Sequence, residues 1–191
     1  MNFFEYLNIG KLADFYARNV DCPHVSKYHR ESYPTHCWLV IDKMTEQYEQ
    51  GNISEEALAA AYLHDIGKPR TAAVKPDGDA CFYGHEQVTE EEVAIFLDPG
   101  YQGFSKVVAL IRAHMLPMLI SERTPEPYRS DNIQKLHDLA EKWGEEFMRD
   151  LDTLTRCDLA SSITEESCLQ LEIEKARARA MAVTCQPSTP W

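Results

Sequence analysis

One stretch of the sequence constrains the fold more than any other: an alanine-rich apolar helix that ends in an adjacent histidine and aspartate. Ser54 is its N-cap, acids fill its first turn, and His64 and Asp65 stand at its C-terminal end. Because its side chains are small, this helix can pack closely against its neighbours. Near a helix end, an imidazole nitrogen and a carboxylate oxygen can reach the same divalent cation. The alternative is an ordinary polar helix terminus, with Gly67 as the cap and Pro69 as the stop.

Apolar residues recur at helical spacing along most of the chain, which predicts an all-α helical bundle. Residues 18–35 gather prolines, histidines and tyrosines without a clear period, so we expect a long loop there. A long helix capped by Asp131 is expected to run through to Asp158. The expected helices cover about residues 2–17 with a break near Gly10, 36–50, 54–65, Gly84 to Pro99, 104–119 with a stop at Pro117, 131–158 and 164–182.

A Pro76-Asp77-Gly78 turn between two short runs interrupts the helical pattern and predicts one small β-hairpin near residues 71–83. No repeat or low-complexity tract divides the sequence. At 191 residues the chain has ample length for one sizeable core. We therefore expect a single domain over residues 1–191, with a mobile tail at 185–191.

The charge balance argues against some classes of function. The sequence carries 31 acidic and 19 basic side chains, a net charge of −12. A sequence-independent nucleic-acid binder needs a basic stripe, so no long nucleic acid is expected as a partner. No apolar run approaches the roughly 18 residues of a membrane span, and Glu5 and Asp14 stand where a signal peptide would be apolar or basic. Six cysteines form no CxxC pair, so we expect a reduced, cytoplasmic protein without membrane contact.

Four of the seven histidines fall at or near the ends of expected helices, next to apolar residues. Helix bundles assemble metal sites in this way, from side chains on facing helices. An aspartate flanked by apolar residues is rarely buried unless it is paired or binds a metal. Each residue alone has an ordinary interpretation, a core histidine or a helix cap, but the joint pattern favours a metal site. Its members are His36, His64, Asp65, His85, His114 and Asp158.

The order of these residues resembles a known signature. His36, then His64-Asp65, then Asp158 is similar to the H…HD…D pattern of the HD-domain superfamily of metal-dependent phosphohydrolases. The run from His64 to Thr71, the segment Phe82-Tyr83-Gly84-His85-Glu86 and the segment Thr155 to Ala160 resemble the HD domain of bacterial CCA-adding enzymes, over about residues 36–160. The sequence holds no counterpart of their nucleotidyltransferase part, so synthesis of tRNA ends is not implied.

The resemblance implies an HD-domain helical bundle that hydrolyses a small nucleotide or related phosphoester, including 2′,3′-cyclic phosphates and phosphomonoesters, through metal-activated water. A mixture of imidazole and carboxylate ligands suits Mn, Fe, Co, Ni or Zn, and the sequence does not choose among them. One or two ions are expected: the first on His36, His64, Asp65 and Asp158, and a second, where the protein is binuclear, on Asp65, His85 and His114.

Four residues are expected to serve the reaction, beginning with Asp65 as a shared ligand. Lys68 and Arg112, with Arg70 as a further candidate, are the cations expected on the phosphate. Glu86 is expected to orient His85 or to act as a general base. The alternative for Lys68 and Arg70 is a solvated helix end.

Two other classes of function fit the same residues. The six-ligand pattern also resembles the mixed-valent di-iron oxygenases of the HD superfamily, which cleave C–C or C–P bonds. Metal content and oxygen dependence would separate that class from the hydrolases. The second class is a sensor that binds a nucleotide without turnover, which is less favoured because no ligand position is degraded.

Overall fold

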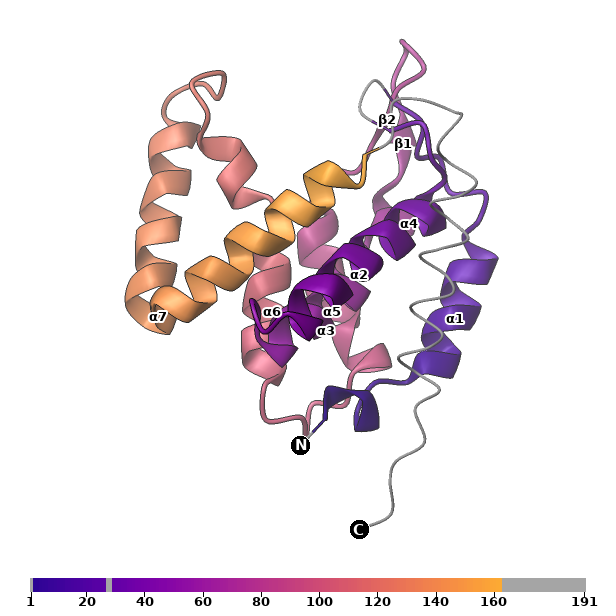
Figure 1. Ribbon diagram of the computed structural model, residues 1–191. Coiled ribbons are helices and arrows are strands. Elements are labelled where there is room, and N and C mark those ends of the chain that lie inside the picture. Colours follow the sequence, from indigo (N-terminus) through magenta and orange to yellow (C-terminus); the bar gives the residue numbers. More distant parts are fainter. Residues whose placement is uncertain (1, 27–28, 163–191) are drawn as a thin grey trace.

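The computed structural model describes residues 2–26 and 29–162, and it confirms an all-α bundle with one small hairpin (Figure 1). The C-terminal helix and tail expected at 164–182 and 185–191 lie outside the described residues. In chain order the elements are η1 (Phe3–Glu5), α1 (Ile9–Arg18), α2 (Tyr33–Glu49), α3 (Glu55–Leu63), α4 (Lys68–Thr71), β1 (Ala73–Val74), β2 (Ala80–Cys81), α5 (His85–Phe96), α6 (Phe104–Ala113), η2 (Leu116–Ile120) and α7 (Tyr128–Ala160).

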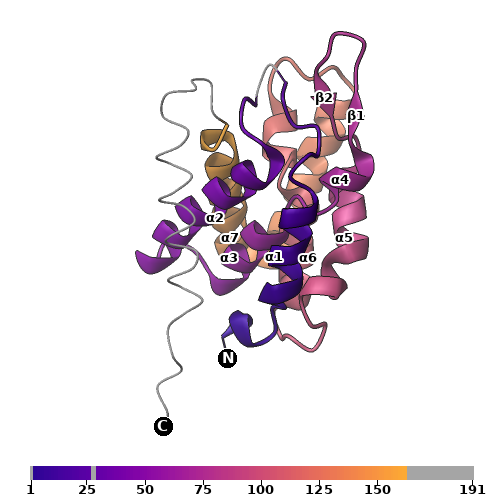
Figure 2. The same ribbon diagram turned by 90° about the vertical axis from the view of Figure 1, so that its right-hand side faces the viewer.

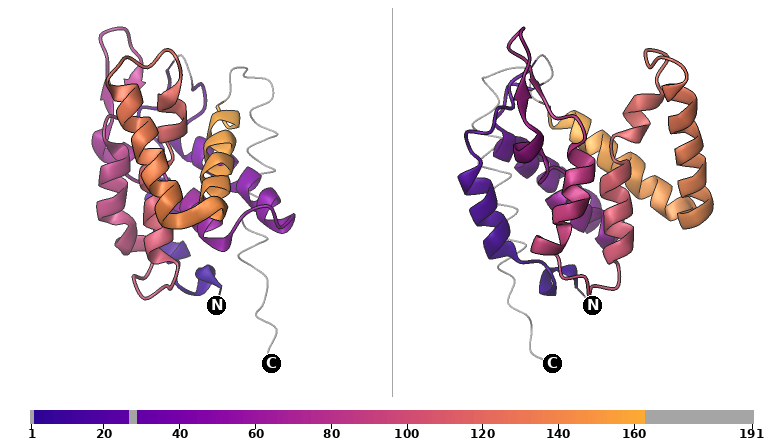
Figure 3. Two further views of the ribbon diagram at one scale, coloured as in Figure 1. Left: turned by 90° about the vertical axis from the view of Figure 1, so that its left-hand side faces the viewer. Right: turned by 180° about the vertical axis from the view of Figure 1, so that it is seen from behind.

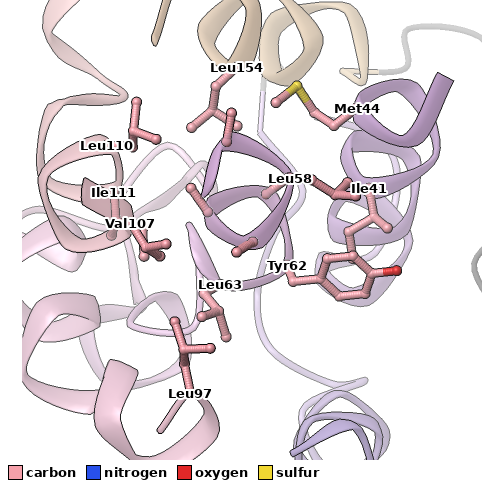
Figure 4. Packing of buried hydrophobic residues seen from close by; sticks show 14 of the residues in the cluster. Ile41, Met44, Leu58, Tyr62, Leu63, Leu97, Val107, Leu110, Ile111 and Leu154 are labelled. Atoms are coloured by element: carbon pink, nitrogen blue, oxygen red, sulfur yellow. The ribbon is translucent and has the colours of Figure 1, made fainter. Parts of the chain in front are cut away.

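Helix α3 is the centre of the bundle. Every residue from Ala57 to Leu63 is buried, and the helix contacts α2, α5, α6 and α7. A helix that is apolar all round must lie inside a protein, and its alanines let the neighbouring helices approach. Figure 4 shows Leu58 and Leu63 surrounded by side chains from α2, α6 and α7, with Ile41 and Leu154 among them.

A buried polar network fixes the start of α3. The Ser54 hydroxyl caps the helix by accepting from the Ala57 N–H, as expected from the sequence. The Asp150 carboxylate of α7 accepts from the Ser54 backbone N–H at 3.0 Å, and Lys106 Nζ of α6 lies 3.2 Å from Asp150 Oδ2. Asp150 is fully buried, whereas 17% of the Lys106 side chain is exposed. This network therefore sets the position of His64 and Asp65 at the other end of α3.

Helix α7 differs from the long helix that the sequence predicts over residues 131–158. It begins at Tyr128, before the expected cap Asp131, and Gly144 interrupts it with φ 80° and ψ −175°. Glycine adopts this positive φ without the Cβ clash of other residues. The half before Gly144 lies with η2 to one side of the bundle, whereas the half after it crosses the bundle (Figure 3). The bend brings Asp158 to the end of α3.

Several helix boundaries also differ. Helix α2 begins at Tyr33, capped by the Ser32 hydroxyl, rather than at residue 36. Helix α3 ends before Gly67, and Pro69 lies in the first turn of α4, where a missing N–H costs nothing. Helix α6 ends at Ala113, ahead of the expected stop at Pro117.

The segment between α1 and α2 belongs to the same end of the molecule as the hairpin (Figure 2). The hairpin expected near residues 71–83 is present, with Ala73 opposite Cys81 and Val74 opposite Ala80 in antiparallel pairing. The Ala80 N–H donates to the Val25 carbonyl at 3.1 Å and so ties the hairpin to the loop before α2. Among the described residues, no helix is long and apolar enough to cross a membrane.

Candidate metal centre

The structure brings all six expected metal ligands together. Five elements meet at one place, because α3, α6 and α7 end there and α2 and α5 begin there. All six side chains are buried, and each reaches the cluster from a helix or from one of the two residues that follow one. They are His36 of α2, His64 and Asp65 after α3, His85 of α5, His114 after α6 and Asp158 of α7.

Asp65 lies between two groups of ligand atoms. On one side, its Oδ2 is 3.1 Å from His64 Nε2 and 3.6 Å from His36 Nε2. His36 Nε2 is in turn 2.8 Å from Asp158 Oδ1. On the other side, Asp65 Oδ1 is 3.3 Å from His85 Nε2 and 3.9 Å from His114 Nε2. Each oxygen of the Asp65 carboxylate thus faces a separate group of nitrogen and oxygen atoms, and each group contains residues that could hold a metal ion.

Backbone carbonyls orient three of the four imidazole rings. The Nδ1 of His64 lies 2.9 Å from the carbonyl of Ala61, and the Nδ1 of His85 lies 2.9 Å from that of Phe82. The Nδ1 of His114 lies 2.6 Å from the carbonyl of residue 111. Because a carbonyl can only accept, each Nδ1 carries the proton and each Nε2 offers a lone pair to the cluster.

The buried atoms of the cluster fit a cation. Among the described residues, both ring nitrogens of His36, His64 Nε2 and both Asp65 oxygens are buried without a well-aligned hydrogen bond. Burying unsatisfied lone pairs and negative charge is costly unless a positive charge lies between them. A donor set of imidazole nitrogens and carboxylate oxygens suits a divalent transition metal.

Family comparison agrees with this geometry. The family profile described as "HD domain" matches residues 33–158, which include the six clustered residues. The chain belongs to the HD-domain family. HD domains bind divalent metals and form a superfamily of metal-dependent hydrolase type, and the two groups around Asp65 are clusters that could hold such an ion.

One relative supports the resemblance to CCA-adding enzymes. The HD domain is similar to the A-adding tRNA nucleotidyltransferase of Deinococcus radiodurans, with 41% identity over 64 residues. The match covers 31% of this chain and 14% of that protein, so the similarity is confined to a short part of the relative. No solved structure matches the chain.

Lys68 brings a positive charge to the cluster of six residues, which we call the HD centre. Its Nζ lies 2.6 Å from Asp65 Oδ2, and only 9% of its side chain is exposed. Burial lowers the pKa of Lys68, but Asp65 and Asp158 outweigh burial and raise it above its ordinary value, so the ammonium stays charged. For Asp65 the directions are reversed: burial raises its pKa, but His64 and Lys68 outweigh burial and hold the pKa well below its usual range.

Two of the four imidazole rings in the HD centre, those of His36 and His114, differ in their charge. Burial and Lys68 lower the pKa of His36, yet the neighbouring carboxylates of Asp158 and Glu31 outweigh them and raise it to about 9. Burial, together with His85 and His64, lowers the pKa of His114 to about 4. Without a metal, His36 is therefore a positively charged imidazolium at neutral pH, whereas His114 is a neutral imidazole.

The structure does not bring either expected arginine to the HD centre. The Arg112 side chain is 60% exposed, and its Nη1 lies 3.1 Å from Glu90 Oε2. Arg70 is 59% exposed and pairs with Glu92 at 2.8 Å. Both arginines point outward from the helices that carry them and pair with acids on α5. Glu86 borders the centre, with Oε2 3.7 Å from His85 Nδ1.

A close backbone contact locks the turn that carries Asp65. A Cβ at Gly67 would lie 2.3 Å from the His85 carbonyl oxygen and 2.7 Å from the Thr89 backbone nitrogen. The Gly67 N–H donates to Thr89 Oγ1 at 2.9 Å, and that hydroxyl donates to the His64 carbonyl at 3.3 Å. Glycine at this position therefore lets α5 approach, which places His85 beside Asp65.

Three residues near the HD centre lie in the segment expected to be only a loop. Glu31 is fully buried, and His24 and His29 lie beside it behind His36. The available signal was one glutamate among three histidines, at positions 24, 29, 31 and 36, in a stretch without helical period. Loop residues have no periodicity that predicts burial, so the sequence alone gave them no role.

Proposed function

We propose that this HD domain hydrolyses a phosphoester in a small nucleotide or related metabolite, with one or two divalent transition metal ions. The observation that carries the proposal is the buried cluster of six ligands with a charged lysine at its edge. An oxygen-rich anion such as phosphate needs compensating charge in a site closed to water. The metal ions that the cluster would hold, together with Lys68, would supply that charge.

The two ligand groups have the composition needed for two ions. His36, His64, Asp65 and Asp158 would hold the first, and Asp65, His85 and His114 the second. When bound, such ions lower the pKa of a coordinated water toward neutrality and neutralise the phosphoryl oxygens. Mn, Fe, Co, Ni and Zn all suit these donors.

Lys68 is proposed to bind the substrate phosphate. Its ammonium is held at the edge of the cluster by Asp65, and it also lies 5.2 Å from the centre of the Phe82 ring and 3.5 Å from His24 Nε2. A lysine acts as a compact point charge, which suits a phosphoryl oxygen. Glu86 is proposed as a general base at the border of the centre, because the Phe82 carbonyl already orients the His85 ring. Arg112 has no part in this proposal, since it pairs with Glu90 on the surface.

A small substrate is proposed because basic groups are scarce. Each phosphate of a long nucleic acid that binds a protein needs a cation, and the chain has a net charge of −12. The single-domain organisation and the cytoplasmic location remain predictions from the sequence.

A panel of nucleotides, cyclic nucleotides and phosphomonoesters, each with Mn²⁺, Fe²⁺, Co²⁺, Ni²⁺ or Zn²⁺ under anaerobic conditions, tests the proposal. Release of phosphate, or opening of a cyclic phosphate, is expected with at least one metal. The proposal fails if turnover requires oxygen and a ferrous–ferric pair, because the protein is then an oxygenase. It also fails if nucleotides bind without being cleaved, as in a sensor.

A further inference from the structure

A second buried polar cluster lies directly behind His36, on the side away from Asp65. Its centre is the carboxylate of Glu31, which is fully buried. Oε1 of Glu31 is 2.6 Å from His29 Nδ1, 3.4 Å from His36 Nδ1 and 3.9 Å from His24 Nδ1. A buried carboxylate is costly unless several donors face it. The convergence of three rings on one oxygen therefore needs an explanation.

His36 differs from the other three histidines in how its Nδ1 is held. His64 and His114 follow the last residues of α3 and α6, where helix carbonyls have no partner within the helix and can accept from a side chain. His36 lies in the first turn of α2, where the backbone carbonyls enter the hydrogen-bond ladder of the helix. No free backbone carbonyl of the helix can therefore accept a hydrogen bond from His36 Nδ1. The Glu31 carboxylate faces this nitrogen instead, at 3.4 Å.

We propose that Glu31 is a positioning residue that accepts a hydrogen bond from the His36 Nδ1–H and keeps the His36 Nε2 lone pair directed at the metal. This role rests on the metal centre proposed above. A metal-binding histidine almost always donates its other N–H to a carboxylate, a carbonyl or water, which fixes its tautomer and its ring orientation. Glu31 supplies this contact from a loop, whereas the other three rings obtain it from backbone carbonyls.

The loop is folded so that the Glu31 carboxylate is held in place. The Arg30 backbone N–H donates to Oε2 at 3.0 Å, while Oε1 faces His29 and His36. The His24 Nδ1–H donates to the Glu31 backbone carbonyl at 3.1 Å. Both oxygens and the backbone of Glu31 are therefore engaged, as a positioning role requires.

The same cluster is less suited to an independent metal ion. His24 Nδ1 is engaged by the carbonyl, and His24 Nε2 faces the Lys68 ammonium at 3.5 Å, which repels a cation. His36 directs its Nε2 into the main centre. These engagements leave only His29 and Glu31, which are too few ligands for a structural site.

Zn²⁺ binding by isothermal titration calorimetry tests the proposal with Glu31→Gln, which keeps the side-chain volume and removes the charge. The affinity for the ion held by His36 is expected to fall about 10- to 100-fold, with an unchanged number of bound ions. Glu146→Gln is the matched control, since this carboxylate pairs with Lys106 on the surface at 2.8 Å. Long-range ¹H–¹⁵N spectra of the Zn²⁺-loaded protein are expected to show a His36 Nδ1–H in the wild type.

Two results would overturn the proposal. One is an unchanged affinity in Glu31→Gln, and the other is the loss of one whole ion with unchanged affinity for the rest, which would make the cluster a separate metal site. If Glu31→Gln does not fold, Glu31→Asp must show the affinity loss, because it withdraws the carboxylate by one methylene. Affinity is read without a substrate, so absence of phosphoester cleavage by the wild type would sink the proposed function and not this inference.

Discussion

Replacing Gly67 by alanine tests the packing that places His85 beside Asp65. The added Cβ would meet three atoms of α5: the His85 carbonyl oxygen at 2.3 Å, and the Thr89 backbone nitrogen and Oγ1 at 2.7 Å each. Two of these three atoms are backbone, so no side-chain rotation relieves the contact, and the turn must move away from α5.

The magnitude follows from two contributions. Overpacking a well-packed interior costs about 1–3 kcal/mol. Moving the turn also weakens the hydrogen bond from the Gly67 N–H to Thr89 Oγ1, worth about 1 kcal/mol. The free energy of unfolding should therefore fall by roughly 2–4 kcal/mol. With an m-value of about 2 kcal/mol per molar urea, the midpoint of unfolding should fall by about 1–2 M.

Urea unfolding followed by circular dichroism measures this change, and Gly10→Ala is the matched control. The nearest atom to a Cβ at Gly10 is 3.8 Å away, and this glycine lies inside α1, where alanine is the better helix former. Gly10→Ala should leave stability unchanged or raise it. Equal midpoints for Gly67→Ala and the wild type would refute the close-packing argument.

Three further predictions concern the site. Lys68→Ala should cost about 1.5–3 kcal/mol of transition-state stabilisation, calculated from kcat/KM for a phosphoester, because a hydrogen bond to a charged phosphate is lost. Arg112→Ala should cost less than about 0.5 kcal/mol by the same measure. Equal effects of the two substitutions would contradict the assignment. The double substitution His85→Ala with His114→Ala should remove one ion and reduce turnover while the other ion stays bound; loss of both ions, seen by elemental analysis, would show a single shared site. Zn²⁺ binding at pH 7 should release about one proton per chain, because the Nε2 proton of His36 must leave before the metal binds. The affinity for Zn²⁺ should therefore rise about tenfold per pH unit up to the His36 pKa of about 9. Calorimetry in buffers of different ionisation enthalpy measures the proton release, and its absence would contradict a positively charged His36.

The bundle and the ligand cluster were predictable because both depend on periodicity and order. Apolar spacing identified α3 and its neighbours, and the order of His36, His64-Asp65 and Asp158 indicated the HD centre. The direction in which a polar side chain points was harder to predict. Arg112 and His114 are two residues apart, yet one pairs with Glu90 on the surface and the other is buried.

The bend in α7 and the role of Glu31 could not be read from the sequence. A glycine inside a helical pattern is compatible with a continuous helix, and only packing against α2 and α3 requires the break at Gly144. Glu31 lies in a loop, where position along the chain does not predict burial. Its importance depends on how His24 and residues 29–31 lie against His36, which no periodicity in the sequence predicts.

The most direct test of the central claim compares the wild type with Asp65→Ala in one preparation. Asp65 is the carboxylate that both ligand groups share. Elemental analysis and an anaerobic phosphoester assay should show bound metal and hydrolysis in the wild type, and neither in the folded variant. Full retention of metal by Asp65→Ala, or equal hydrolysis by the two proteins, would contradict the account.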